Sequence, residues 1–200
     1  MATRARAATP QIRRRGSEAQ EAEIVRLRAE LATARARIVE LEALADIDPL
    51  VDVLNRRGFE RVLTRSLAFL KRYGSAAALI YLDLDGFKDV NDQNGHPAGD
   101  ALLKAVAMTL SRQVRASDVV ARLGGDEFAV LLWNVDAVHA RNKAADLEAA
   151  VAAIIVEHGG ISLSVGISAG FAMLTGAVTA AQAIEVADSA MYVRKRQRRV

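Results

Sequence analysis

The feature that most constrains the fold is a pair of apolar segments separated by glycines. Residues Val119–Leu123 are mostly apolar and β-branched, Ala129–Trp133 are apolar throughout, and Gly-Gly-Asp-Glu-Phe fills residues 124–128 between them. Two strand-like segments joined at a Gly-Gly pair predict a β-hairpin. Glycine accepts positive φ and lets an anion approach the backbone. Adjacent carboxylates there would need a cation beside that anion, which indicates Mg²⁺ and a nucleotide. A polar hairpin tip without a ligand is the alternative.

A second strand-like segment also ends in acidic residues. Residues 76–82 are apolar with one Tyr, and Asp83-Leu84-Asp85-Gly86 follows them. Side chains at i and i+2 share one face of a strand, so Asp83 and Asp85 can point at one ion. An EF-hand loop is excluded, because its fifth and sixth positions need an oxygen ligand and Gly, and here they are Phe87 and Lys88. Two acidic strand ends favour a cation site over a polar tip.

These segments belong to a longer series of motifs. The series comprises Asp83–Asp92, Gly95-His96, Gly99-Asp100, Arg122–Phe128, Ser164–Ile167 and Ala187–Tyr192. In order and spacing it resembles the GGDEF diguanylate cyclases, from about Asp48 to the C-terminus. The family usually opens with Asp-x-Leu-Thr-Gly-Leu-x-Asn-Arg-Arg, and Val51 and Asp52 stand here in place of the Thr and Gly. This departure bears on the transmission of a signal more than on catalysis.

The resemblance implies condensation of two GTP molecules into cyclic di-GMP with release of two pyrophosphates, one GTP being held on each protomer of a homodimer. It maps Asp83, the Leu84 carbonyl and Asp126 onto ligands for Mg²⁺, with Mn²⁺ as an alternative. It offers Asp126 or Glu127 as the proton acceptor, and Lys88 as a phosphate contact that stabilises charge in the transition state. For Asp85, a helix cap at the Phe87 turn is the favoured interpretation.

The resemblance also implies residues that bind the substrate and the product. Asn91 and Asp100 map onto guanine-reading positions, since a carboxylate accepts from N1–H and the 2-amino group while an amide donates to O6 or N3. The remaining substrate positions are Phe87, His96 and Gly125 near the nucleotide, and Lys195 and Arg199 on the terminal phosphates. Arg115 and Asp118 match the family's Arg-x-x-Asp product-inhibition site, where Arg forks to guanine or phosphate.

Charge and composition narrow the function classes. The chain has no Cys, which excludes disulfides and thiol chemistry, and no apolar stretch approaches a membrane span. The net charge of +3 hides an acidic body, because basic residues cluster at residues 4–15 and 194–199. Neither cluster has interleaved aromatic residues, so we expect solvated tails rather than contacts with nucleic acid or lipid. A cytoplasmic protein without a membrane partner is expected.

The N-terminal part predicts a dimerisation helix. We expect a disordered basic arm over residues 1–16, a parallel coiled coil over 17–47 and the catalytic GGDEF domain over 48–200. Position a of the heptads holds Ile24, Leu31, Ile38 and Ala45, and position d holds Leu27, Ala34 and Leu41. The pairs between g and e positions are Glu23 with Arg28, Glu30 with Arg35 and Arg37 with Glu42, all of opposite sign. An amphipathic helix packed on its own domain is the alternative.

The expected fold class is α+β. We predict an antiparallel-centred, ferredoxin-like sheet of the palm or nucleotidyl-cyclase type, with helices on one side. The expected elements are helix 59–73, strand 76–85, a helix from Phe87, helix 99–114, the hairpin, helix 136–157, strand 161–169 and a final helix from Thr179. Two alternatives to an active cyclase remain open: a catalytically silent receptor for cyclic di-GMP or GTP, and a coiled-coil scaffold with basic tails.

Overall fold

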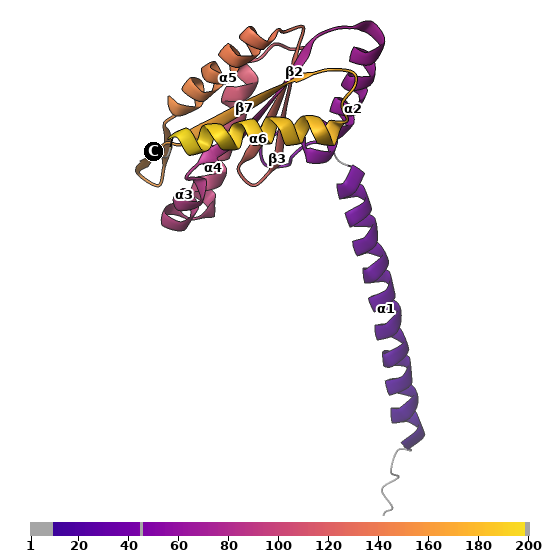
Figure 1. The fold of residues 1–200 in the computed structure, drawn as a ribbon. Coiled ribbons are helices and arrows are strands. Elements are labelled where there is room, and N and C mark those ends of the chain that lie inside the picture. Colours follow the sequence, from indigo (N-terminus) through magenta and orange to yellow (C-terminus); the bar gives the residue numbers. More distant parts are fainter. Residues whose placement is uncertain (1–9, 45, 199–200) are drawn as a thin grey trace, which may run out of the picture. The chain divides into compact units, whose positions relative to one another are not determined.

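The computed structural model describes residues 10–44 and 46–198, and the chain divides into two compact units between residues 45 and 46. The first unit is helix α1, Pro10–Leu44, which Figure 1 shows as one continuous helix. The helix therefore begins inside the segment that we expected to be a disordered arm. Proline suits the start of a helix, because its missing N–H would have no partner there.

The second unit holds the remaining elements. They are β1 Leu54–Asn55, α2 Arg56–Tyr73, β2 Ala77–Asp85, α3 Phe87–Asn94, α4 His96–Arg112, β3 Val119–Gly124, β4 Glu127–Trp133, α5 Ala137–Ala152, β5 Val156–His158, β6 Ile161–Leu163, β7 Gly166–Leu174 and α6 Ala180–Arg198. In the described residues, no helix is long and apolar enough to span a bilayer.

The main sheet has the strand order β1-β3-β4-β2-β7. Strand β2 pairs antiparallel with both β4 and β7, and β3 pairs antiparallel with β4. The two-residue strand β1 is parallel to β3 and was not predicted. The antiparallel-centred α+β fold is thereby confirmed.

Helices cover both faces of this sheet, so the prediction of helices on one side was wrong (Figure 1). One core contains Leu102, Val106 and Leu110 of α4 with Leu147 and Val151 of α5. The opposite core contains Phe59, Leu63 and Leu67 of α2 with Ala183, Ala187 and Met191 of α6. Residues 77–82 of β2 are all buried, so both faces of this strand are apolar. Each face must therefore be covered by a separate layer of helices.

The segment after α5 differs most from the prediction. Helix α5 ends at Ala152, and β5 pairs antiparallel with β6 as a separate hairpin around Gly159 and Gly160. The predicted strand 161–169 is in fact the short β6 followed by β7. Both glycines have positive φ, which closes the tight turn and leaves Val156–His158 extended instead of helical.

Gly170 sets the distance between β7 and α6. A Cβ at this position would meet the backbone of Ala187 and Met191 at distances that real atoms do not reach. We expect Gly170→Ala to push α6 off the sheet and to lower the free energy of unfolding by about 1–3 kcal/mol, the usual cost of overpacking. Denaturant unfolding measures this loss. Gly124→Ala is the control, because its Cβ would lie an ordinary 3.7 Å from Glu127 Oε2. Equal stability of the two variants would contradict the expectation.

Candidate active site

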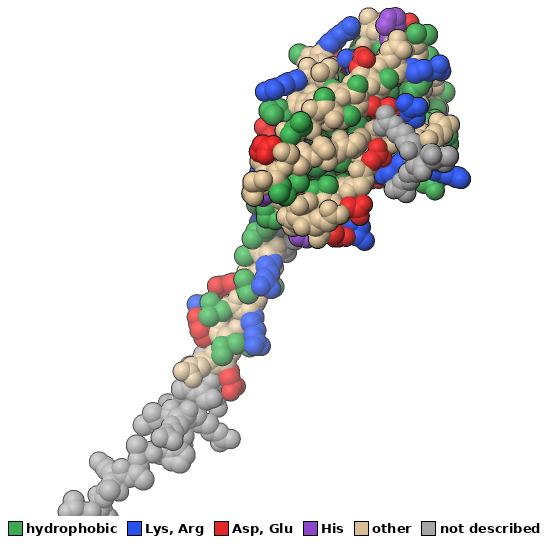
Figure 2. Space-filling view, turned by 90° about the vertical axis from the view of Figure 1, so that its left-hand side faces the viewer, with side chains coloured by type: hydrophobic (Ala, Val, Ile, Leu, Met, Phe, Trp, Pro, Cys, Tyr) green, Lys and Arg blue, Asp and Glu red, His purple; other side chains and the backbone are tan. Residues whose placement is uncertain are grey.

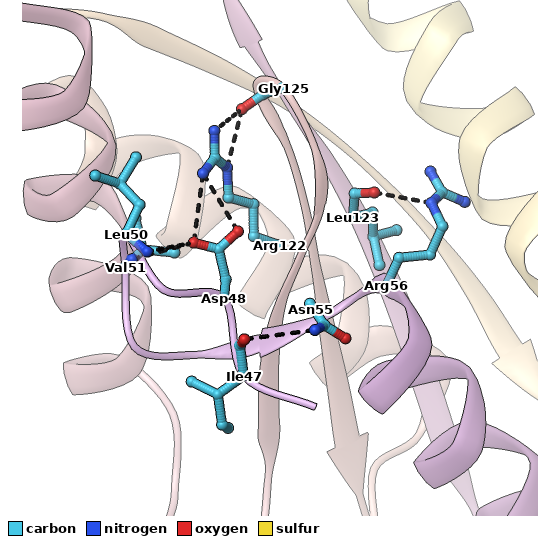
Figure 3. Close-up of polar contacts among 9 residues, drawn as sticks. All are labelled: Ile47, Asp48, Leu50, Val51, Asn55, Arg56, Arg122, Leu123 and Gly125. Carbon is cyan, nitrogen blue, oxygen red and sulfur yellow. Dashed lines mark hydrogen bonds and ion pairs between the residues drawn. The ribbon is translucent and has the colours of Figure 1, made fainter. Parts of the chain in front are cut away.

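The predicted β-hairpin is confirmed, and Arg122 bonds to the backbone of its tip (Figure 3). Strands β3 and β4 meet at the turn Gly125–Asp126, where Gly125 has a φ of 36°. Arg122 donates from Nε and Nη2 to the Gly125 carbonyl at 3.0 and 2.7 Å. The guanidinium thereby fixes the backbone on which Asp126 and Glu127 are mounted.

The same Arg122 pairs with Asp48, 3.3 Å away, in the segment that opens the domain (Figure 3). The Asp48 carboxylate also accepts from the backbone N–H groups of Leu50 and Val51, at 2.9 and 3.2 Å. Asp52, which stands where the family usually has Gly, adopts a left-handed φ of 55°. The opening turn therefore keeps a glycine-like backbone and is joined directly to the hairpin tip.

Strand register brings the two acidic segments together. Asp83 of β2 lies opposite Glu127 of β4, and the Leu84 N–H donates to the Asp126 carbonyl at 3.2 Å. Burial raises the pKa of Asp83, its hydrogen bond and ion pair with Lys195 oppose that shift, and the negative charges of Asp126 and Glu127 raise it further. Three carboxylates thus crowd one end of the central strands, where a cation would lower their mutual repulsion.

A lysine lies among these oxygens. The Lys195 ammonium of α6 pairs with Asp83, lies 3.4 Å from the Leu84 carbonyl and lies 4.0 Å from Asp85 Oδ1. Lys195, which the sequence analysis predicts to contact the terminal phosphates, is paired with Asp83 in this structure. Two carboxylates and a carbonyl around one positive charge form an oxygen set that suits a hard divalent cation.

Asp85, for which a cap role at the Phe87 turn is predicted, lies one residue before Gly86, the N-cap residue of α3. Ser168 Oγ of the neighbouring β7 donates to both carboxylate oxygens of Asp85, at 2.9 and 3.1 Å. Asp85 shares a strand face with Asp83, so β7 fixes one of the oxygens near Lys195.

Two residues that the sequence analysis did not place in the site contact Glu127. Arg56 Nη2 lies 3.4 Å from Glu127 Oε2, and its Nε donates to the Leu123 carbonyl at 2.8 Å. Tyr81 hydrogen-bonds Glu127, and burial, this bond and the charge of Glu127 all raise the tyrosine's pKa. The sequence could have indicated Tyr81 as a site residue, because a residue two positions before Asp83 points to the same face of β2.

The predicted guanine-reading and phosphate residues lie on two helices that follow β2. Phe87, Lys88 and Asn91 lie on α3, and His96 and Asp100 lie on α4. The helices meet at Gly99, where a Cβ would collide with the Asn91 side chain. Phe87 is buried in the core, whereas Lys88, His96 and Asp100 are exposed. Arg199 lies outside the described residues.

Arg115 and Asp118 lie in one turn between α4 and β3. The Arg115 N–H donates to Asp118 Oδ2 at 3.0 Å, and the Trp133 N–H donates to Asp118 Oδ1 at 3.1 Å. Both residues line a cleft of about 510 Å³ that reaches His139 and Lys143 of α5. The Asp118 carboxylate is therefore oriented by backbone donors at the wall of a cleft.

Within the described residues, no three Asp, Glu or His side chains form a metal-binding group by themselves. A divalent ion at the strand ends would accordingly take the carboxylates of Asp83 and Asp126 and the Leu84 carbonyl, with substrate or water oxygens completing its shell. Two observations fit such an ion. The strand register sets Asp83 opposite Glu127, and the Lys195 ammonium lies against the Asp83 carboxylate.

An antiparallel-centred α+β domain with carboxylates collected beside a glycine turn belongs to the palm-type, nucleotidyl-cyclase class of architecture. The family model described as "Diguanylate cyclase, GGDEF domain" matches residues 45–200. The chain belongs to the GGDEF-domain family.

Relatives agree with this assignment. The chain is 40% identical over 154 residues to the diguanylate cyclase TpbB of Pseudomonas aeruginosa, which is 76% of this chain and 35% of that protein. A sensory box/GGDEF family protein from Caulobacter crescentus has a TM-score of 0.71 and 35% identity, over 76% of this chain and 99% of that one. The coiled coil and GGDEF domain of DgcB from Caulobacter crescentus, in complex with c-di-GMP, has a TM-score of 0.73 and 27% identity, over 89% and 95%.

Proposed function

We propose that the protein is a diguanylate cyclase that condenses two GTP molecules into cyclic di-GMP. The observation that carries this proposal is the strand register that sets Asp83 opposite Glu127 and next to Asp126. In each half-reaction the 3′-hydroxyl oxygen of one GTP bonds to the α-phosphorus of the other. The bond from that phosphorus to the bridging oxygen breaks, and pyrophosphate leaves.

Some of the proposed site residues stabilise charge or transfer a proton, and others position the nucleotide. Asp83, the Leu84 carbonyl and Asp126 would hold Mg²⁺ or Mn²⁺, and the bound ion would polarise the α-phosphate. Asp126 or Glu127 takes the proton of the attacking hydroxyl. Lys88 counters charge on the phosphate in the transition state. Phe87, Gly125 and His96 lie near the nucleotide, and Lys195 and Arg199 hold its terminal phosphates.

Guanine selectivity is proposed for Asn91 and Asp100. A carboxylate accepts from N1–H and the 2-amino group of guanine, and adenine lacks that pair of donors. The close approach of α3 and α4 at Gly99 supports this assignment, because it positions the Asn91 side chain against α4.

The reaction needs two active sites face to face, so we propose a homodimer formed through α1. Ile24, Leu27, Leu31, Ile38 and Leu41 are each 48–54% exposed in the single chain. Figure 2 shows apolar side chains beside charged ones along the described part of this helix. A parallel coiled coil would bury this seam. The DgcB structure likewise comprises a coiled coil and a GGDEF domain.

We propose feedback inhibition by cyclic di-GMP at Arg115 and Asp118. We expect Arg115→Ala to make GTP turnover insensitive to product, shifting the inhibitory concentration by at least about tenfold, because a forked Arg contact with guanine or phosphate is lost. Turnover is measured against added cyclic di-GMP. Arg112→Ala removes the same charge at the end of α4 and serves as the control. Equal product sensitivity in Arg115→Ala and the unmodified protein would refute the assignment.

A catalytically silent receptor is the second candidate. The departure of Val51 and Asp52 from the Thr and Gly that the family usually has keeps this candidate open. Incubation with GTP and Mg²⁺, followed by nucleotide analysis across protein concentrations, tests the two functions. Formation of cyclic di-GMP supports the cyclase. Calorimetric binding of cyclic di-GMP without any turnover of GTP would support the receptor instead.

A further inference from the structure

Helix α6 carries Lys195 in its last turns, beyond the apolar residues that pack on the sheet. The buried residues are Ala183, Ala187 and Met191, and the partly buried Ala180 and Ile184 pack beside them. All of these residues precede Arg194 and Lys195 in the helix. The position of Lys195 therefore depends on contacts made by the charged residues beyond Met191.

Glu148 of α5 makes the principal contact of this kind. It is only 4% exposed, although it is a carboxylate. Its Oε1 accepts from the Ala169 N–H at 2.9 Å, and Arg194 Nη2 donates to its Oε2 at 3.2 Å. Arg194 Nε lies 3.5 Å from Oε1, so the guanidinium approaches the carboxylate with two nitrogens. The carboxylate is buried whereas the Arg194 side chain is half exposed. Loss of the guanidinium would leave a buried carboxylate without its charged partner, which is costly.

The place of Ala169 explains why the carboxylate is buried. Strand β7 is an edge strand, paired only with β2 in the main sheet. Edge strands present backbone donors that need partners from outside the sheet. Glu148 satisfies the Ala169 donor, and Ala169 lies opposite Leu82, the residue before Asp83. One carboxylate thus joins α5, the edge of β7 and the C-terminal part of α6.

Arg194 and Lys195 are consecutive residues, and consecutive side chains in a helix point about 100° apart. Arg194 is held on the α5 side by Glu148, and Lys195 is held at the end of β2 by Asp83. Two anchors in different directions define the rotation of the helix about its axis. We propose that Glu148 and Arg194 are positioning residues, whose ion pair sets the rotation of α6 and so holds Lys195 at the nucleotide site.

This inference rests on the proposed function, in which Lys195 binds the terminal phosphates of GTP. A purely structural ion pair would lower stability without distinguishing among ligands. A positioning ion pair acts only through Lys195. Loss of the ion pair should therefore weaken the binding of ligands that carry terminal phosphates and leave the binding of those that lack them unchanged.

The test uses the full chain with Mg²⁺ and two nucleotides that lack the attacking hydroxyl. These are 3′-deoxy-GTP and 3′-deoxyguanosine 5′-monophosphate, with binding measured by calorimetry. We expect Arg194→Ala to weaken the binding of 3′-deoxy-GTP about tenfold, the scale of one charged contact, and to leave the affinity for the monophosphate unchanged. Arg194→Lys should restore most of the loss. Arg196→Ala, which removes an equal charge from the same turn, should bind both ligands normally.

A double variant separates positioning from direct binding. In a Lys195→Ala background, Arg194→Ala should cause no further loss of 3′-deoxy-GTP affinity. If Arg194→Ala does not fold, Glu148→Gln replaces it, because the amide still accepts from Ala169 while the ion pair is lost. Additive losses, or equal losses for both nucleotides, would overturn the inference alone. An unmodified protein that does not bind 3′-deoxy-GTP would overturn the proposed function as well.

Discussion

Asp126→Asn should abolish measurable formation of cyclic di-GMP, with a loss of at least about a hundredfold, the scale of removing one preorganised electrostatic partner. The change keeps the size of the side chain and the turn geometry, since Asn is a favoured residue in turns. It removes one of the negative charges that cluster with Asp83 and Glu127 at the strand ends. The cation held there would bind more weakly, and one candidate proton acceptor would be gone.

The measurement is nucleotide analysis after incubation with GTP and Mg²⁺. Asp92→Asn on α3 makes the same chemical change at an exposed position away from the strand ends and should retain full turnover. Both variants should unfold at nearly the same temperature as the unmodified protein. Retention of full activity in Asp126→Asn would exclude the metal role and the base role of this residue together.

Leu31→Lys should dissociate the dimer and reduce turnover per protomer by at least about tenfold at tens of micromolar protein, because a lysine at position a places two like charges in the seam. Leu31 is 50% exposed in the single chain, so the substitution costs an isolated helix little. Its effect should therefore appear only through self-association. Sedimentation velocity and turnover across protein concentrations measure the two consequences.

Val25→Lys is the matched control for this experiment. Val25 is 66% exposed on the same helix and lies at position b, outside the proposed seam. It should leave both the sedimentation coefficient and the turnover unchanged. A fully active monomeric Leu31→Lys protein would contradict the proposed requirement for two face-to-face sites.

Elements whose signals lie close together in the chain were predicted well. The β3–β4 hairpin follows from two apolar segments around a glycine turn, and helix α1 follows from the heptad pattern. The β5–β6 hairpin was missed because each strand has only three residues, too few to show a period. The helices on both faces were missed because an apolar run does not reveal how many of its faces are covered.

By itself the amino-acid sequence determined the family, the carboxylates at two strand ends and the glycine turn beside them, and it predicted a helix that pairs with a second copy. Only the tertiary structure decided which groups these carboxylates meet. Arg122 reaches Asp48 across 74 residues, Arg194 reaches Glu148 across 46, and Lys195 reaches Asp83 across 112. Such contacts arise from strand order and helix rotation, which depend on packing across the whole sheet. No local pattern of residues encodes them.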